Sequence, residues 1–288
     1  MNVYATATQI KNLLGQSNQV TADDSLLVSI AVQSSRLIDM YTRRKFYPRY
    51  ETKAYDHPVD YNRTLILFDD LLSVATLTTD SGDTTITSAN YYLMRGDQYE
   101  TPSNQIALNH SSNVWGFGDS NRSANSIVGI WGYHNDWGNA WAKIDDVQDS
   151  PLLVGGTSLT VADANGADEW GIEPRFQVGQ LIRFGATATA EYAWITNVNL
   201  GTNVLTIVRG VNGSTAAEQA NDVDIYVYRP QADIQQAAQF LGVHLYRRKD
   251  SVGSLNDQPV ASPTGLILSQ DLPREVRDMI KQYMVIVP

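Results

Sequence analysis

The pattern of apolar residues is helical at both ends of this chain and alternates, as in β-strands, over the long stretch between them. Spacings of three and four predict a short and a longer helix within residues 8–46, and two more helices at 233–249 and 272–287. Helices from the two ends can pack together only if the intervening β segments project from the helical unit. This arrangement favours a subunit whose helices build a shared ring or scaffold, and it suits a one-piece enzyme less well.

The composition excludes several classes of function. The 288 residues include no cysteine, so disulfides, thiolate catalysis and cysteine-based zinc sites are excluded. The histidines lack the spacing of metal ligands: His57, His110, His134 and His244. The sequence has no run of about 18 apolar residues and no pattern of a secretory signal at its start. We therefore expect that the protein does not contact a membrane and that it folds in the cytoplasm.

The net charge of −10 argues against tight binding of duplex DNA by the whole surface. Affinity for nucleic acid comes largely from cations that neutralise phosphates, and this chain has an excess of carboxylates. An acidic surface is still compatible with DNA that slides past it, because fixed negative charge repels phosphate. Composition alone does not separate that role from plain solubility.

The first long helix has an apolar stripe and charged residues at both ends. Asp23 and Asp24 stand where carboxylates would satisfy the free amide groups of the first turn. Arg43, Arg44 and Lys45 stand in the predicted last turn, where cations oppose the negative end of the helix dipole. Helix-end electrostatics is the favoured interpretation of this basic triplet, and a contact with another subunit is the alternative. The stripe comprises Leu27, Ile30, Ala31, Ser34, Leu37, Ile38 and Tyr41.

The two C-terminal helices show the same kind of pattern. The stripe of the helix at 233–249 comprises Ile234, Ala237, Ala238, Leu241 and Leu245, and Val276, Ile280 and Tyr283 share a face of the last helix. The helix at 233–249 again ends in basic residues, so the candidates for inter-subunit contact are Arg43, Arg44, Arg247 and Arg248. The chain then ends on an apolar tail, although chain ends are usually polar. Such a tail either tucks into its own core or inserts into a partner, and both interpretations stay open.

Two β regions lie between the helices. The first has predicted strands at 65–68, 74–79, 91–94, 105–108 and 127–133, separated by turns at a spacing that favours an antiparallel sheet. Residues 137–151 resemble a linker, with an acidic run that ends at a proline. The second has predicted strands at 158–162, 181–184, 192–197, 204–208 and 224–228.

The predicted fold class is α+β. A small helical bundle from both chain ends carries an antiparallel β segment and an inserted small β-barrel or sandwich domain. The predicted domains are a connector domain at 1–142 plus 230–288 and an inserted β domain at 151–229.

Several short patterns resemble catalytic or metal sites but lack what the chemistry requires. Two acidic residues precede tryptophans, at Asp136–Trp137 and Glu169–Trp170, without the paired carboxylates across a cleft that a glycosidase needs. The acidic segment that begins at Asp163 is better explained as a β-turn than as a calcium loop. We assign no catalytic, cofactor or metal residue and expect that the protein is not an enzyme.

Large aromatic residues crowd one stretch: Trp115, Trp131, Tyr133, Trp137 and Trp141. Packing in the core and at strand edges is the favoured interpretation, because the segment 131–133 looks like a strand. A face that binds sugar or protein is the alternative.

The order of these segments resembles one family. The opening ATQIKNLLGQSNQVTADDSLLVSIAVQSSRLIDMYTRRKFYP is similar to the N-terminus of head–tail connector (adaptor, or head-completion) proteins of long-tailed bacteriophages. LILFDDLLSVATLTTDSGDTTITSANYYLMRGD resembles their β segment, and ADIQQAAQFLGVHLYRRKDS and DLPREVRDMIKQYMVI resemble their last two helices. GQLIRFG, EYAWITNV and LTIVRGVNGSTAAEQANDVDIYV resemble a small β module that recurs in phage structural proteins and is absent from a minimal connector.

The resemblance implies a structural virion protein at the head–tail junction, assembled in the host cytoplasm. Such proteins form a ring, typically of twelve subunits, that extends the DNA channel below the portal protein and docks a stopper or tail-completion protein. The resemblance implies that the tail binds the portal through Tyr283, Met284, Val285, Ile286, Val287 and Pro288. The alternative function is a phage protein that binds a receptor or carbohydrate, with Trp131 or Trp137 in its binding face.

Overall fold

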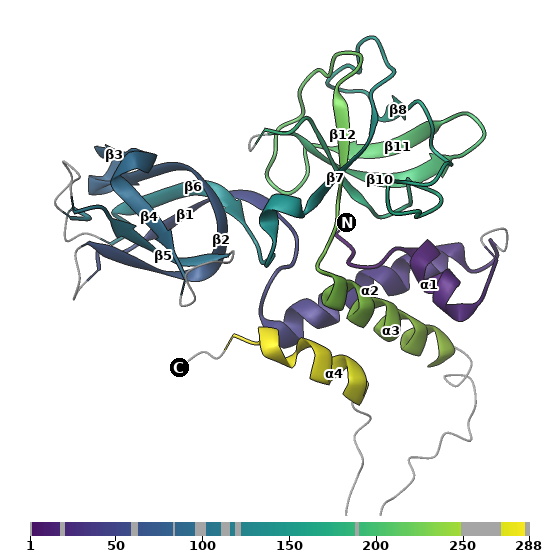
Figure 1. Ribbon diagram of the computed structural model, residues 1–288, viewed down its shortest axis with the longest axis horizontal. Coiled ribbons are helices and arrows are strands. Elements are labelled where there is room, and N and C mark those ends of the chain that lie inside the picture. The colour runs from purple at the N-terminus through teal and green to yellow at the C-terminus, as the bar shows by residue number, and fades with distance from the viewer. Residues whose placement is uncertain are drawn as a thin grey trace, which may run out of the picture.

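The computed structural model describes residues 2–17, 21–58, 63–82, 84–95, 102–110, 116–118, 122–187, 190–248 and 272–285. The helices form one unit, and two β-sheets project from it in different directions (Figure 1). The chain leaves the helical unit after its second helix, builds both sheets in turn, and returns to the unit for its third helix.

Four α-helices occur in the described part of the chain: α1 (Ala7–Leu14), α2 (Asp24–Thr42), α3 (Ala232–Arg247) and α4 (Arg274–Ile280), the last followed by the 3-10 turn η5 (Lys281–Tyr283). A capping box of Thr6 and Gln9 begins α1, and Gly15 ends it in the left-handed conformation. The helices share one core, which includes Ile10, Leu27, Ile38, Ile234, Leu241, Val276 and Ile280. The prediction that both chain ends pack into one helical unit is confirmed.

The start of α2 differs from the prediction. Asp23 precedes the helix, but its carboxylate accepts no hydrogen bond from the first-turn amides. Asp23 instead accepts a hydrogen bond from the hydroxyl of Tyr246, and Asp24 forms an ion pair with Lys11. The predicted capping role of these side chains is wrong, because partners on α3 and α1 compete for the same oxygen atoms.

The first sheet contains β1 (Arg49–Tyr55), β2 (Thr64–Thr79), β3 (Thr84–Ile86), β4 (Tyr91–Met94), β5 (Ser103–Leu108) and β6 (Asn125–Trp131). The order is β1-β6-β2-β5-β4 with β3 on β2, and every pairing is antiparallel, as predicted. β2 joins two predicted strands into one, with register shifts that bend it between β5 and β6. β1 and β3 were not predicted, because β1 is mostly polar and β3 has three residues.

The second sheet contains β7 (Trp141–Asp146), β8 (Ser158–Thr160), β9 (Leu181–Phe184), β10 (Tyr192–Asn199), β11 (Val204–Arg209) and β12 (Asp224–Tyr228). Its antiparallel order is β7-β12-β9-β10-β11-β8. The predicted linker is wrong, because β7 lies within it and pairs with β12. The second sheet therefore begins before the predicted boundary at residue 151, and the division into two domains stays a prediction.

The two edges of the second sheet approach each other at one place. Val147, which follows β7, forms an isolated antiparallel bridge with Val161, which follows β8. The amide of Gln148 donates to the carbonyl of Thr160 over 2.9 Å beside this bridge. The strand order is that of an open sheet, so the predicted barrel stays a prediction.

The two sheets also contact each other near the helical unit. The amide of Tyr50, on β1, donates to the carbonyl of Asn212 in the second β region over 2.8 Å. Gly213 has a φ of 82°, and a Cβ atom there would collide with the carbonyl oxygen of Tyr50. Glycine is thus required here both for the left-handed turn and for the close approach of two backbones.

Candidate partner-binding surfaces and a junction cavity

The helical unit and both sheets meet at a cluster of aromatic rings. Phe46, Tyr133 and Tyr283 contact one another edge to face, with centroid distances of 5.3–5.6 Å. The hydroxyl of Tyr228, at the end of β12, donates to the carbonyl of Phe46 over 2.9 Å. The amide of Phe46 donates to the hydroxyl of Tyr4 over 2.9 Å. Edge-to-face rings and buried hydrogen bonds of this kind fix relative orientation, so the three units are held in a defined arrangement.

Burial dominates the electrostatics of this cluster. It raises the pKa of Tyr4, and the neighbouring carboxylate of Asp39 raises it further. Burial also raises the pKa of Tyr228 and of Tyr283. The phenols therefore keep their protons at neutral pH and act as hydrogen-bond donors.

The C-terminal tail begins inside the protein. Tyr283 is buried, its hydroxyl donates to Asp233, and its carbonyl accepts from Nε of Arg44 over 2.7 Å. The amide of Val285 donates to the carbonyl of Thr42 over 3.0 Å, whereas Met284 is 40% exposed. Tyr283, one of the residues predicted to bind the portal, thus belongs to the chain's own core, and both interpretations of the apolar tail that follows it, Met284 to Pro288, stay open. The predicted portal-binding residues Ile286, Val287 and Pro288 lie outside the described residues.

The basic triplet follows α2 instead of closing its last turn. α2 ends at Thr42, and Arg43 adopts the left-handed conformation with a φ of 58°. Arg44 forms an ion pair with Asp70 and lies 4.6 Å from the centre of the Tyr133 ring. Lys45 forms an ion pair with Asp39 at 2.9 Å. Two of the three cations therefore form ion pairs within the same chain, while Arg43 is exposed.

The two predicted arginine pairs lie at opposite ends of the helical unit. Tyr246, beside Arg247 and Arg248, bonds to Asp23 at the start of α2. Asp233, at the start of α3, instead bonds to Tyr283 near the end of α2. α2 and α3 are thus antiparallel. The structure brings Arg43 and Arg44 together with the tail and places Arg247 and Arg248 away from it, and the inter-subunit role of all four stays a prediction.

A strip of exposed apolar side chains on the first sheet was not predicted. Its members on β2 and β4 are Ile66, Phe68, Tyr92 and Met94, and we call them the outer apolar strip. Ile66 and Met94 both pair with Gln105 of β5, so they lie in one row on the same face of the sheet. Phe68 is 87% exposed. The sequence indicates this strip in the four consecutive apolar residues 65–68, because consecutive side chains of a strand point to opposite faces and cannot all reach one core.

The tryptophans of the crowded stretch pack as the favoured interpretation states. Trp131 is 0% exposed, and its Nε1 donates to the carbonyl of Glu51 over 3.0 Å. Trp141 stacks on Tyr192 and contacts Trp137 edge to face. Trp115 lies outside the described residues. A binding face at Trp131 is therefore excluded by its burial.

The acidic segment after β8 is a turn, as predicted. Oδ1 of Asp163 accepts hydrogen bonds of 3.0 Å from the amides of both Asn165 and Gly166. These two backbone donors lower the pKa of Asp163. Among the described residues, no group of three or more histidine or acidic side chains is arranged to hold a metal ion. Within the same residues, no helix is long and apolar enough to cross a membrane.

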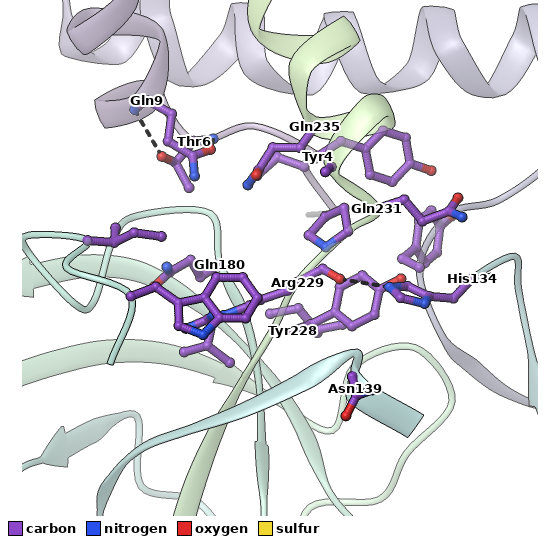
Figure 2. A pocket seen from close by; sticks show the side chains of 18 of the residues that line it. Tyr4, Thr6, Gln9, His134, Asn139, Gln180, Tyr228, Arg229, Gln231 and Gln235 are labelled. Carbon is purple, nitrogen blue, oxygen red and sulfur yellow. Dashed lines mark hydrogen bonds between the residues drawn. The ribbon is translucent and has the colours of Figure 1, made fainter. Parts of the chain in front are cut away.

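A cavity of about 510 Å³ lies where the helical unit meets the second sheet. Figure 2 shows its lining: Tyr4, Thr6 and Gln9 from the start of the chain, and Gln231 and Gln235 from the start of α3, face Gln180, Arg229 and Asn139. The sequence could not predict this cavity, because its walls come from segments far apart in the chain. The nearest signals were the neighbours Asp136–Trp137 and Glu169–Trp170, since Asp136 and Trp170 both line it.

Two side chains of the cavity, those of His134 and Arg229, are held by hydrogen bonds. Nδ1 of His134 accepts from the amide of Asp136 over 3.1 Å, so Nε2 carries the proton and donates to the carbonyl of Arg229 over 3.0 Å. Burial lowers the pKa of His134 and so favours this neutral ring. Nη2 of Arg229 donates to Asp168 over 2.8 Å, and its guanidinium carbon lies 3.5 Å from the centre of the Trp170 ring.

The chain was compared with family models, curated proteins and solved structures, and a match was found among the solved structures. No family model matches the chain, and no curated protein matches it. Among solved structures, a chain described as "Neck of empty GTA particle computed with C6 symmetry" is similar to it, with a TM-score of 0.35 and 10% sequence identity. The match covers 99% of this chain and 91% of that chain. A TM-score this low carries no argument about function, so the function is argued from the residues of this chain.

Proposed function

We propose that this protein is a structural subunit of a phage-like virion, located at the head–tail junction. In this proposal it forms a ring, of about twelve subunits as the family resemblance implies, that joins the head to the tail and extends the DNA channel below the portal. The observation that carries the proposal is the architecture: helices from both chain ends close into one core, and two sheets project from it (Figure 1). A central helical unit with projecting β parts suits a subunit that contacts several neighbours at once.

A ring requires two different surfaces on each subunit, because a heterologous contact joins one face to another face of the next copy. The outer apolar strip of the first sheet is one such surface, since exposed apolar patches mark protein contacts. The end of α2, where exposed Arg43 lies beside the emerging tail, is a second. We propose that the tail beyond Tyr283 docks on the portal protein and that a stopper or tail-completion protein binds the opposite side of the ring.

DNA would pass through the ring without sequence-specific binding. The chain carries 31 acidic against 21 basic residues, so an assembled ring carries a large negative charge. Negative charge along the channel would repel phosphate and let the duplex slide. This part of the proposal fails if the acidic side chains do not face the channel of an assembled ring.

Antibody labelling of intact virions, viewed by electron microscopy, tests the proposal directly. Label at the junction of head and tail is expected. Label at the tail tip or on fibres would move the function to host recognition, and absence of label would indicate an assembly factor that leaves the particle.

A truncation tests the role of the tail. Deleting residues 286–288 keeps the hydrogen bond between Val285 and Thr42 and the buried ring of Tyr283, so the fold and melting temperature should not change. Binding to portal protein, measured by co-sedimentation, should be lost. Leu200→Ser, which changes an exposed apolar residue outside the tail, is the matched control and should keep the binding. Full binding by the truncated chain would exclude the tail as the portal contact.

A further inference from the structure

A turn in the second β region presents two apolar side chains to solvent. The turn lies between β7 and β8, and a hydrogen bond of 2.8 Å from the amide of Gly156 to the carbonyl of Leu153 closes it. Leu153 is 60% exposed and Val154 is 53% exposed. Surface turns are ordinarily built from polar residues, glycine and proline. We call Leu153 and Val154 the apolar tip, and their exposure points to a contact that buries them.

The apolar tip is held in place by a buried arginine. Arg209 donates through Nη1 to the carbonyls of both tip residues, over 3.3 Å in the case of Val154. An ion pair with Glu191 fixes Arg209 in turn, and these two side chains are 5% and 1% exposed. Leu152, just before the tip, is buried and pairs with Gln219 in an antiparallel bridge. The tip is thus preorganised, and a preorganised loop loses little entropy when it binds.

An exposed carboxylate stands beside the apolar tip. Glu218 lies between two residues that are tied to the tip, because Arg209 also donates to the carbonyl of Ala217 and Gln219 pairs with Leu152. The side chain of Glu218 is exposed, and within the described part of the chain it forms no ion pair. The tip surface therefore combines two apolar side chains with one negative charge that is not neutralised.

A groove of matching character lies on the helical unit. It has a volume of about 340 Å³ and lies between the end of α1, the second half of α3 and the start of α4. Leu13 is 44% exposed there. The groove has room for two aliphatic side chains, so it can receive the apolar tip. Its solvent-accessible apolar residues are Leu13, Phe240, Val243 and Pro273.

The charges of the groove favour an acidic partner. Arg247 and Glu275 line it together with His244. Burial and the neighbouring charge of Arg248 lower the pKa of His244, so this ring is neutral at pH 7. Two arginines against one glutamate leave the groove positive. Arg247 is exposed and forms no ion pair with the residues that the structure describes, so Glu218 of the tip has the complementary charge.

The apolar tip and the groove of one copy lie too far apart to meet. α3 begins directly after β12 and runs away from the second sheet (Figure 1). At a rise of 1.5 Å per residue, Val243 lies about 16 Å beyond Ala232 along the helix. A contact between tip and groove therefore joins two copies. Such a contact is heterologous, which is the kind that closes into a ring.

We propose that the apolar tip of one subunit inserts into the groove of the next, where Glu218 pairs with Arg247. This inference rests on the proposed ring, because it requires copies that lie side by side. It gives Arg247 a partner and a role that Arg43 and Arg44 do not share, since these two lie at the other end of the helical unit.

Engineered cysteines test the contact, because the chain contains no cysteine of its own. Full-length Val154→Cys and Val243→Cys are mixed at about 1 mM, which populates even a contact with a dissociation constant of about 1 mM, and are then oxidised. On a non-reducing gel, the mixed disulfide dimer should exceed either homodimer by at least about fivefold, because a disulfide requires close Cβ atoms. The matched control mixes Val154→Cys with Met40→Cys, an exposed position on α2 outside the groove.

A charge exchange separates a specific contact from chance collision. Glu218→Arg in the first variant, or Arg247→Glu in the second, should lower the mixed dimer by about two- to fivefold. The two changes together should restore it. Leu153→Ser should lower it by at least about tenfold, whereas Leu200→Ser, at another exposed apolar site of the second β region, should not. All these side chains are exposed, so the melting temperatures should not change.

The proposal is overturned if the mixed dimer does not exceed the Met40→Cys control, or if the charge exchange does not restore it. Flotation with phosphatidylcholine vesicles that is lost in Leu153→Ser would assign the apolar tip to a lipid surface instead. The virion labelling described above is independent of this experiment. A mixed dimer with label away from the junction would keep the contact and refute the location, whereas label at the junction without a mixed dimer would do the reverse.

Discussion

The two sheets of this protein use their apolar residues differently. The second sheet buries them in a core that includes Leu159, Ile182, Ile195 and Ile207, and the Val147–Val161 bridge links its edges. The first sheet also has a core, around Leu71, Ile106 and Trp131, but leaves the outer apolar strip in solvent. The second β region also exposes apolar residues, but of Leu153, Val154, Trp170, Leu200 and Val208 only Val208 lies in a strand.

This difference gives the two sheets different roles: the second sheet contributes stability, and the first sheet offers a surface for contact with other chains. The second sheet buries apolar residues of its strands in a core of its own, so we expect it to hold its shape as a unit. The first sheet satisfies one face only, and its edge strand β4 has one neighbour, β5. An exposed strip beside a free edge is the usual form of a surface that awaits another chain. We therefore expect the first sheet to make protein contacts in the assembly, while the second sheet holds its shape without them.

The largest expected effect is on the buried ion pair of the second sheet. Glu191 accepts hydrogen bonds from Nε of Arg209 at 2.7 Å, from the amide of Ala217 at 3.1 Å and from Gln219 at 3.0 Å. Glu191→Ala leaves Arg209 buried without its partner and should lower the free energy of unfolding by about 3–5 kcal/mol. Urea titration followed by circular dichroism measures this. Asp278→Ala, in an exposed ion pair on α4, is the control, and equal losses in the two variants would show that burial adds nothing.

The next effect distinguishes the two sheets within one molecule. Gly129 lies on β6 where a Cβ atom would collide with the carbonyl oxygen of Ser73 on β2. Gly129→Ala should cost about 1–3 kcal/mol, and amide exchange should accelerate in the first sheet while the second keeps its protection. Gly155→Ala is the control, because no atom lies within 4 Å of the added Cβ atom. Equal acceleration in both sheets would contradict their independence.

A smaller effect on stability should accompany a change in assembly. Replacing both Phe68 and Met94 with serine removes exposed apolar surface, so the free energy of unfolding should change by less than about 0.5 kcal/mol. Incorporation of the protein into virions, measured by immunoblot of purified particles, should fall. The matched control replaces Leu200 and Val208 of the second β region with serine and should be incorporated normally. If the two double variants behave alike, the outer apolar strip is not a contact surface.

The smallest expected effect is a pH dependence at the junction cavity. Burial lowers the pKa of His134, with partial opposition from the carbonyl of Arg229 and from Asp136. The unfolded chain takes up a proton below the ordinary histidine value of 6.5, and folded His134 resists it, so stability is lost as the pH falls from about 6.5 toward the lowered pKa. Melting temperatures from pH 7.5 to 5 should fall more steeply for the wild type than for His134→Gln. The same slope in both proteins, with exposed His110→Gln as a further control, would show that His134 does not contribute.

Much of the fold follows from local pattern. The helices and nine of the twelve described strands were predictable because apolar spacing and turn residues agree with the final packing. β7 was missed because the acidic residues Asp145 and Asp146 indicate a solvated linker. In the fold, Asp145 is buried and accepts hydrogen bonds from the amides of Ala162 and Asp163. Composition could not reveal that backbone amides in the loop after β8 would donate hydrogen bonds to the carboxylate of Asp145.

The amino-acid sequence by itself determined the helices and most of the strands, the absence of cysteine chemistry and the closing of both chain ends into one helical core, because these depend on the periodicity and identity of neighbouring residues. Tertiary structure alone decided what the polar side chains do. It directed Asp23 to Tyr246, Arg44 to Asp70 and Tyr283 into the core, and it left Gln231 without a partner in a cavity. Hydrogen bonds and ion pairs depend on distances of about 3 Å between residues that are far apart in the chain, and no local pattern encodes such distances.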